Sequence, residues 1–163
     1  MNEVDQLIAR FGLRPLPHEG GWYSQTWHGP VTSTDRGPCP EGTCILYLLA
    51  GAEFSALHRL PDNEVWHFHA GDAVELLRLD PATGNGGWTR LGPGVLAADA
   101  PQAVVPAEWW QGARLVPGGR WALLGCTMVP GWEDADFELG HRAALVAAFP
   151  QWTDAVRALT RGQ

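Results

Sequence analysis

Short runs rich in apolar residues, each about as long as a β-strand, follow one another from residue 43 to residue 128. The runs are TCILYLL, EFSALHR, EVWHFH, AVELLRL, GWTRL, QAVVP, WWQGARLV and RWALLGCTMV. Glycine and proline separate several of them, for example in the turns at residues 84–87 and 117–119. Strands at this spacing predict a β-sandwich or β-barrel, an all-β fold.

Both ends of the chain show the helical period instead. Residues 3–11 carry apolar side chains at helical spacing, and Gly12 follows as a stop. The pattern becomes helical again from about residue 139, is broken at Pro150 and resumes over residues 153–159. We therefore expect a short N-terminal helix and C-terminal helices that pack on the outside of the sheet.

Between the first helix and the strand series lie two segments with different predictions. The Gly20-Gly21 pair excludes a helix, and an early strand is expected to begin at Trp22-Tyr23. Residues 29–42 are rich in Gly, Pro, Ser and Thr, which predicts a surface loop.

Composition and charge narrow the classes of protein. The chain has 163 residues, of which 45% are hydrophobic and 18% charged, so we expect one folded domain over residues 1–163. The net charge is −7 and there is no run of Lys or Arg, which argues against nucleic acid or an anionic membrane as a partner.

Apolar runs and cysteine spacing predict the cellular location of the protein and the redox state of its cysteines. The first residues lack the basic start and apolar run of a signal peptide, and the longest apolar run, residues 44–52, is too short to cross a bilayer. A cytoplasmic location is predicted. The three cysteines, Cys39, Cys44 and Cys126, lack a CxxC spacing, so free thiols are expected.

The stretch over residues 51–71, GAEFSALHRLPDNEVWHFHAG, is predicted to form a hairpin with its turn at residues 60–63. Strand alternation puts Phe54 on the same side as His58. If Glu64 faces that side as well, one imidazole and one carboxylate share an apolar space lined by aromatic rings. Such a space suits a small molecule.

The same alternation sorts the other aromatic and histidine side chains of the hairpin. Trp66 and Phe68 accompany Glu64, whereas His67 and His69 point to the opposite face, where histidine is often structural. The chain also contains nine tryptophans, a number that suits a broad pocket or a subunit interface.

Two spacings resemble the motifs of the cupin superfamily. His58, Glu64 and Gly71 match the spacing of the first cupin motif, and residues from Pro106 to Gln111 have the frame of the second. Gln111 stands where that second motif has histidine.

The chain further resembles one uncharacterised branch of that superfamily, a domain of unknown function. The segments that carry this resemblance are EGGWY, EVWHFHAGD, PQAVVP, GCTMVPG and ADFELG, and they extend over nearly the whole chain. The resemblance implies a double-stranded β-helix, or cupin jelly roll, that forms a homodimer. It brings no settled reaction, and Ser24-Gln25 departs from the branch, so no ligand preference is carried over.

Metal-bearing cupins hold an ion with three histidines and a glutamate, and the equivalent positions here read His58, Leu60, Glu64 and Gln111. Leucine cannot coordinate, and an amide oxygen suits Mg or Mn better than Zn or Fe(II). No metal cofactor is therefore expected. A divalent metal, if one is bound, would take His58, Glu64 and Gln111 as its ligands.

Without a metal, His58 and Glu64 are expected to be catalytic as a proton-transfer pair. A carboxylate in an apolar pocket has a raised pKa, and an imidazole that is hydrogen-bonded to it is held in one tautomer. The expected function is a small-molecule-binding cupin that acts as a metal-independent isomerase or epimerase on a sugar derivative or carbonyl compound. Two alternatives stay open, a non-catalytic ligand-binding cupin and a metal-dependent dioxygenase.

The ligand is expected to lie among aromatic rings with Gln111 as an additional polar group. Trp109 is favoured for this pocket over Trp110 because Trp109 shares the strand side of Gln111. The expected aromatic walls are Trp66, Phe68, Trp109 and Tyr47.

Overall fold

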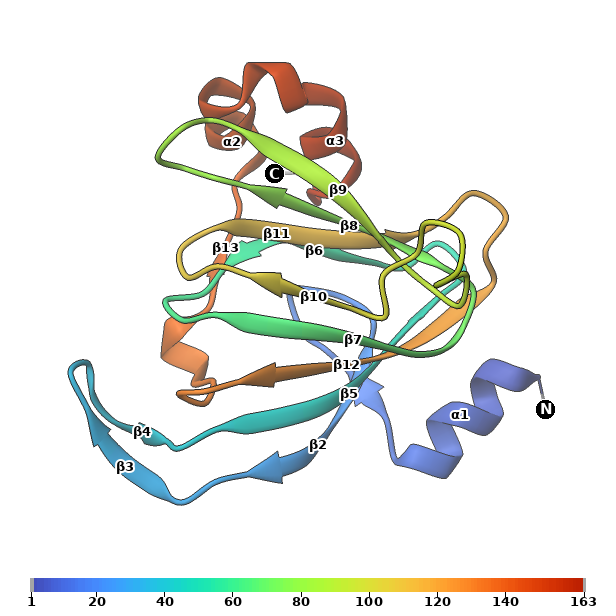
Figure 1. Ribbon diagram of the computed structural model, residues 1–163, viewed down its shortest axis with the longest axis horizontal. Coiled ribbons are helices and arrows are strands. Elements are labelled where there is room, and N and C mark those ends of the chain that lie inside the picture. Colours follow the sequence, from blue (N-terminus) through green and yellow to red (C-terminus); the bar gives the residue numbers. More distant parts are fainter. Residues whose placement is uncertain (1, 163) are drawn as a thin grey trace.

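The structure, a computed structural model that describes residues 2–162, contains two large antiparallel sheets that face each other (Figure 1). The first sheet has the strand order β1 (Arg14–Pro15), β2 (Trp22–His28), β5 (Thr43–Ala50), β12 (Trp121–Met128), β7 (Glu64–Gly71) and β10 (Gln102–Val105). The second has the order β13 (Glu138–Leu139), β6 (Phe54–Arg59), β11 (Trp110–Leu115), β8 (Val74–Leu79) and β9 (Gly86–Leu91). The predicted all-β fold is confirmed, and each predicted strand forms.

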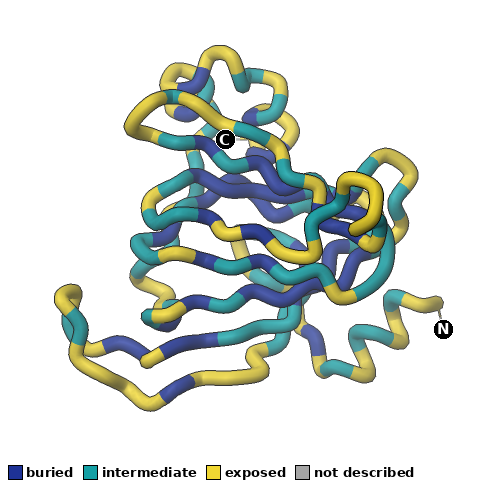
Figure 2. The backbone as a smooth tube through the Cα atoms, viewed as in Figure 1, coloured by how far each residue is buried: buried dark blue, intermediate teal, exposed yellow. Residues whose placement is uncertain are grey.

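The main core fills the space between the two sheets, as the dark central strands of Figure 2 show. It contains Tyr47 and Trp66 from the six-stranded sheet and Leu76 and Leu115 from the five-stranded sheet, each almost entirely buried. Residues that alternate inward along a strand therefore meet the inward residues of the opposite sheet, which is how a jelly roll buries apolar surface.

The predicted helices form and cover the outer faces of the sheets. Helix α1 (Glu3–Phe11) starts with a capping box, in which the backbone N–H of Asp5 donates to Asn2 Oδ1 at 2.9 Å. Its apolar side packs beside Leu48 and Leu123 on the outer face of the six-stranded sheet. Helices α2 (Arg142–Ala148) and α3 (Thr153–Ala158), joined by η2 (Pro150–Trp152), pack on the five-stranded sheet.

The segment over residues 29–42 is not the loop that its composition predicts. It forms a second, two-stranded sheet from β3 (Val31–Thr34) and β4 (Gly37–Pro40), which extends from the ends of β2 and β5 (Figure 1). Pro38 and Pro40 alternate with Cys39, so the positions without an N–H can both point away from the partner strand. Proline therefore does not exclude a strand here.

Phe54 does not share the side of His58, contrary to the alternation argument. The register between β6 and β11 shifts between the pair Gln111–His58 and the pair Ala113–Ser55, which marks an irregularity in the strand pairing. Phe54 consequently packs with the outer cluster under α2 and α3, and the Arg161 guanidinium lies 4.4 Å from its ring centroid.

The acidic segment after residue 131 contains an element that the sequence pattern did not reveal. After the 3-10 helix η1 (Asp134–Asp136), strand β13 pairs with the edge of β6 and places Glu138 opposite Arg59. The Glu138 carboxylate accepts a hydrogen bond from Arg59 Nε at 2.7 Å. The segment is thus tied to the five-stranded sheet.

Two smaller predictions concern location and cysteine chemistry. No helix in the part of the chain that the structure describes is long and apolar enough to cross a membrane. The cytoplasmic location itself stays a prediction. All three cysteines have free thiols, as predicted.

Candidate functional site

A cavity of about 670 Å³ is walled by both large sheets. Strands β2, β5, β7 and β12 contribute residues from one sheet, and β6 contributes His58 from the other. The loop with His18 and Glu19 and the segment over residues 132–137 complete the walls. The hairpin predicted over residues 51–71 does not form, because β6 and β7 belong to opposite sheets and do not pair. His58 and Glu64 nevertheless both line this cavity, one from each sheet.

The imidazole of His58 is only 2% exposed, and its hydrogen bond defines its tautomer. Nδ1 lies 2.8 Å from the carbonyl oxygen of Ala56, and because a carbonyl can only accept, Nδ1 carries the hydrogen. The lone pair is left on Nε2. The ring of Phe137 stacks on the imidazole at 5.1 Å between centroids and an interplanar angle of 25°. A backbone carbonyl, and not Glu64 as expected, thus holds the tautomer.

Glu64 is 8% exposed, and its environment changes its acidity. Burial raises the pKa of its carboxyl group from 4.5 to about 7; the nearby His58 opposes the rise and the Glu19 charge adds to it. At neutral pH the side chain is therefore divided between its protonated and ionised forms. The raised pKa agrees with the expectation for a carboxylate in an apolar pocket.

Trp66 and Gln111 lie next to the Glu64 carboxylate in the buried interior. The indole Nε1–H of Trp66 lies 2.8 Å from Gln111 Oε1 and 3.2 Å from Glu64 Oε2, so it donates to both. All three side chains are buried. Trp66 and Gln111 orient the carboxylate, but neither lines the cavity among the residues that the structure describes.

The other three predicted aromatic residues also lie in the core instead of on the cavity wall. The Tyr47 hydroxyl donates to the carbonyl oxygen of Gly20 at 2.8 Å, and its ring meets Trp66 edge-on at 5.8 Å. Phe68 and Trp109 pack against the core between the sheets. Their predicted contact with a ligand stays a prediction.

Several residues on the cavity wall escaped the sequence analysis. They are Arg14, Tyr23, Gln25, Cys126, Trp132, Asp134 and Phe137. Three of the recognised segments, EGGWY, GCTMVPG and ADFELG, contain three of them, Tyr23, Cys126 and Phe137, and those segments were the available signal. Burial raises the pKa of the Cys126 thiol, and the Glu64 carboxylate to which it hydrogen-bonds raises it further, so Cys126 stays protonated beside Glu64.

His67 and His69 lie on the outer face of the six-stranded sheet, as alternation predicts. Nε2 of His67 lies 3.2 Å from the Thr127 hydroxyl, and the two imidazole rings are nearly parallel at 6.4 Å between centroids. Neither histidine lines the cavity in the described part of the chain.

The donor set of the cavity does not fit the metal centre that metal-bearing cupins carry. Within residues 2–162, no three His, Cys, Asp or Glu side chains lie close enough together to hold a metal ion. Leu60 occupies one ligand position, and the Oε1 atom of Gln111 already accepts from Trp66. One imidazole and one carboxylate are fewer than the three protein ligands of a non-haem iron site.

Comparison with known proteins identifies similar chains. A family model described as the cupin superfamily (DUF985) matches residues 5–140. Protein SO0799 from Shewanella oneidensis is 31% identical with a TM-score of 0.89, over 100% of both chains. A hypothetical protein from Leishmania major is 27% identical with a TM-score of 0.88, over 98% of this chain and 99% of its own.

A more distant similarity concerns the fold alone. A dTDP sugar isomerase from Desulfovibrio desulfuricans is 17% identical with a TM-score of 0.56, over 83% of this chain and 91% of its own. No curated protein matches the chain.

Proposed function

Since this chain belongs to the cupin superfamily, in the DUF985 family, we propose that its cavity binds a small carbonyl compound or sugar derivative and isomerises or epimerises it by proton transfer. The observation that supports this proposal is the pairing of His58 and Glu64 on one cavity. His58 has a free Nε2 lone pair, and Glu64 has a pKa of about 7. An imidazole nitrogen with a lone pair and a carboxyl group that is partly protonated near pH 7 suit general acid–base catalysis.

In the proposed reaction, Nε2 of His58 removes a proton from the carbon next to the substrate carbonyl. The electron pair of that C–H bond moves to the carbonyl oxygen, and protonated Glu64 donates a hydrogen bond to this oxygen. The Nδ1–H bond to Ala56 orients the imidazole and stabilises the imidazolium that forms. Return of the proton from His58 to the neighbouring carbon gives the isomer. For the epimer, a solvent molecule in the cavity gives a proton to the opposite face, and His58 releases the proton that it holds to solvent.

Arg14 favours a substrate with an anionic group. It is the one arginine among the described residues that line the cavity, and its guanidinium lies 4.9 Å from the centroid of the Tyr23 ring. It forms no ion pair with any carboxylate in the described part of the chain. A substrate carboxylate or phosphate could therefore use a guanidinium that is not already neutralised.

The proposal is tested by exchange of substrate C–H hydrogen with solvent deuterium across a panel of sugar phosphates and oxo acids. We expect wild type to catalyse exchange on at least one member. The His58→Ala variant should lose about 100-fold or more of that rate while it keeps the fold, because it lacks the base. NMR or mass spectrometry of the substrate measures the exchange.

A matched control uses a histidine that the fold places outside the cavity. The His67→Ala variant removes an imidazole from the outer face of the same sheet, and its exchange rate should equal that of wild type. A His58→Ala variant as active as wild type would reject the mechanism. Binding without exchange across the panel would favour a non-catalytic ligand-binding protein.

The homodimer expected from the family resemblance also stays a prediction. Sedimentation equilibrium of the purified protein measures it directly.

A further inference from the structure

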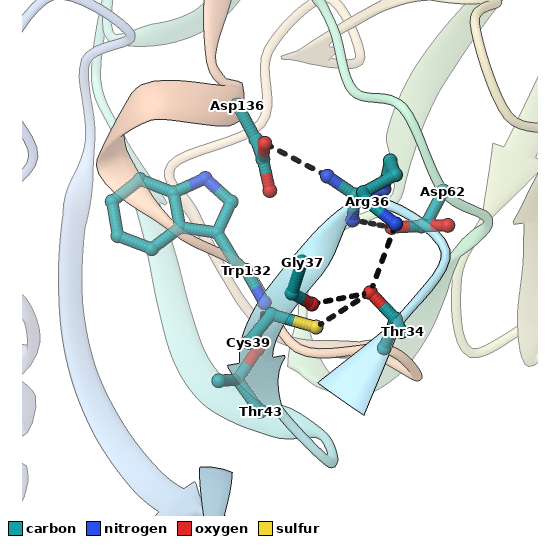
Figure 3. Close-up of polar contacts among 8 residues, drawn as sticks. All are labelled: Thr34, Arg36, Gly37, Cys39, Thr43, Asp62, Trp132 and Asp136. Carbon is teal, nitrogen blue, oxygen red and sulfur yellow. Dashed lines mark hydrogen bonds and ion pairs between the residues drawn. The ribbon is translucent and has the colours of Figure 1, made fainter. Parts of the chain in front are cut away.

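The tip of the β3–β4 hairpin carries an arginine that joins two other segments of the chain (Figure 3). Nη1 of Arg36 lies 2.9 Å from Oδ1 of Asp136, and its Nη2 forms an ion pair with Asp62. Asp62 follows β6, and Asp136 belongs to η1. Residues 36, 62 and 136 are far apart in sequence, and one guanidinium holds both carboxylates.

The hairpin tip is shaped to present this guanidinium. The Thr34 hydroxyl donates to the Gly37 carbonyl oxygen at 2.7 Å and accepts from the backbone N–H of Arg36 at 3.3 Å. The buried Cys39 thiol lies 3.6 Å from the same hydroxyl, as Figure 3 shows. These contacts close the turn and leave the Arg36 side chain directed toward the two aspartates.

Both aspartates lie within segments that form the cavity. Asp62 lies in the turn between Leu60 and Glu64, and both of these neighbours line the cavity. Asp136 immediately precedes Phe137, the residue whose ring stacks on His58. Arg36 therefore contacts the turn that precedes Glu64 through Asp62. Through Asp136 it contacts the segment whose Phe137 stacks on His58.

A second contact fixes the beginning of the same segment. The backbone N–H of Trp132 donates to the Thr43 hydroxyl at 3.0 Å, and both residues line the cavity (Figure 3). The segment over residues 132–137 is thus held at one end by β5, and at the other by Arg36 together with β13, which follows it and pairs with β6. If Arg36 is lost, the end of the segment that contains Phe137 loses the ion pair between Arg36 and Asp136.

Loss of Arg36 removes more than one contact, because it also leaves the negative charges of Asp62 and Asp136 without a compensating positive charge. The side chains of Asp62 and Asp136 are 20% and 18% exposed, and that of Arg36 is 35% exposed. Partial burial weakens the screening of these charges by water. Without the guanidinium, the like charges of the two carboxylates that Arg36 bridges are no longer compensated, and their repulsion disfavours the close approach of the two cavity segments.

We propose that Arg36 is a positioning residue that holds the segment over residues 132–137 against the turn at Asp62, and so keeps Phe137 on His58 and limits access to the cavity. Only the expected effect of Arg36 on catalysis depends on the proposed function. The effect on access to the cavity is measurable without any substrate.

The test compares Arg36→Gln with Arg114→Gln. Arg114 forms a single surface ion pair with Glu75 at 2.9 Å, and neither residue lines the cavity. In Arg36→Gln we expect amide hydrogen exchange over residues 132–137 to rise about tenfold, and N-ethylmaleimide to label Cys126, on the cavity wall, about tenfold faster. In Arg114→Gln both rates should equal those of wild type.

A double variant tests the role of charge repulsion. Arg36→Gln with Asp136→Asn removes one of the two facing carboxylates, so both rates should return most of the way to the wild-type values. The proposal is overturned if Arg36→Gln leaves both rates unchanged, or if it raises exchange equally throughout the chain, as general destabilisation would. If an exchanging substrate is found, its kcat should fall in Arg36→Gln; these access rates decide the proposal even if the proton-transfer function fails.

Discussion

Replacing Glu64 by glutamine is expected to change the free energy of unfolding more favourably at pH 8 than at pH 4. In wild type, burial raises the pKa of this carboxyl group from 4.5 to about 7, which means that the folded state favours the protonated form. Its contribution to stability is therefore complete below pH 4.5 and is lost as the pH rises through 7. The difference between the two pKa values corresponds to about 3 kcal/mol. Glutamine is uncharged at every pH and avoids this loss.

Urea unfolding of both proteins between pH 4 and pH 8.5 measures this effect. The free energy of unfolding of Glu64→Gln minus that of wild type should increase by up to about 3 kcal/mol across the range, with the steepest change between pH 5 and pH 7. The same substitution at the exposed Glu41 is the control and should show no such trend. Parallel pH curves for Glu64→Gln and wild type would contradict the raised pKa.

Replacing Gly71 by alanine is expected to cost about 3 kcal/mol of stability. Gly71 ends β7 with φ at 97°, a backbone conformation that favours glycine. A Cβ atom there would lie 2.4 Å from the carbonyl oxygen of Trp121 at the start of β12. The substitution therefore adds a backbone clash to the strain of a positive φ, at the point where the two central strands meet.

Gly118 allows the two contributions to be separated. It has φ at 82°, but a Cβ atom there would have no neighbour within 4 Å. The Gly118→Ala variant should lose only about 1 kcal/mol, the cost of the φ strain alone. Thermal or urea unfolding of both variants measures the difference. Equal losses at the two positions would show that the close approach of Trp121 is not what requires glycine at position 71.

Sequence patterns with a short period predicted most of the fold correctly. The helix over residues 3–11, the strand series after residue 43 and the helices on either side of Pro150 depend on side chains that lie within a few residues of one another. His58 and Glu64 share the cavity for a reason that alternation does not supply, because β6 and β7 lie in opposite sheets that both wall it. The motif segments predicted the family, and the match of the family model to residues 5–140 confirms it.

Other features required contacts between distant segments. Composition predicted a loop at residues 29–42, but pairing between Val31 and Pro40 makes it a hairpin. Phe54 lies outside because the pairing of β6 with β11 is irregular, which no pattern within β6 reveals. The expected aromatic residues pack in or against the core between the sheets, since alternation gives the side of a strand but not the depth along the barrel. Their contact with a ligand stays a prediction.

The sequence by itself thus determined most of the elements, the family, and His58 and Glu64 as the candidate titratable pair. Only the tertiary structure decided what surrounds that pair. The carbonyl of Ala56 defines the tautomer of His58, burial among both sheets raises the pKa of Glu64, and Arg36 reaches carboxylates at positions 62 and 136. Burial, electrostatics and ion pairing depend on distances in space, and these distances exist only once the sheets have closed on each other.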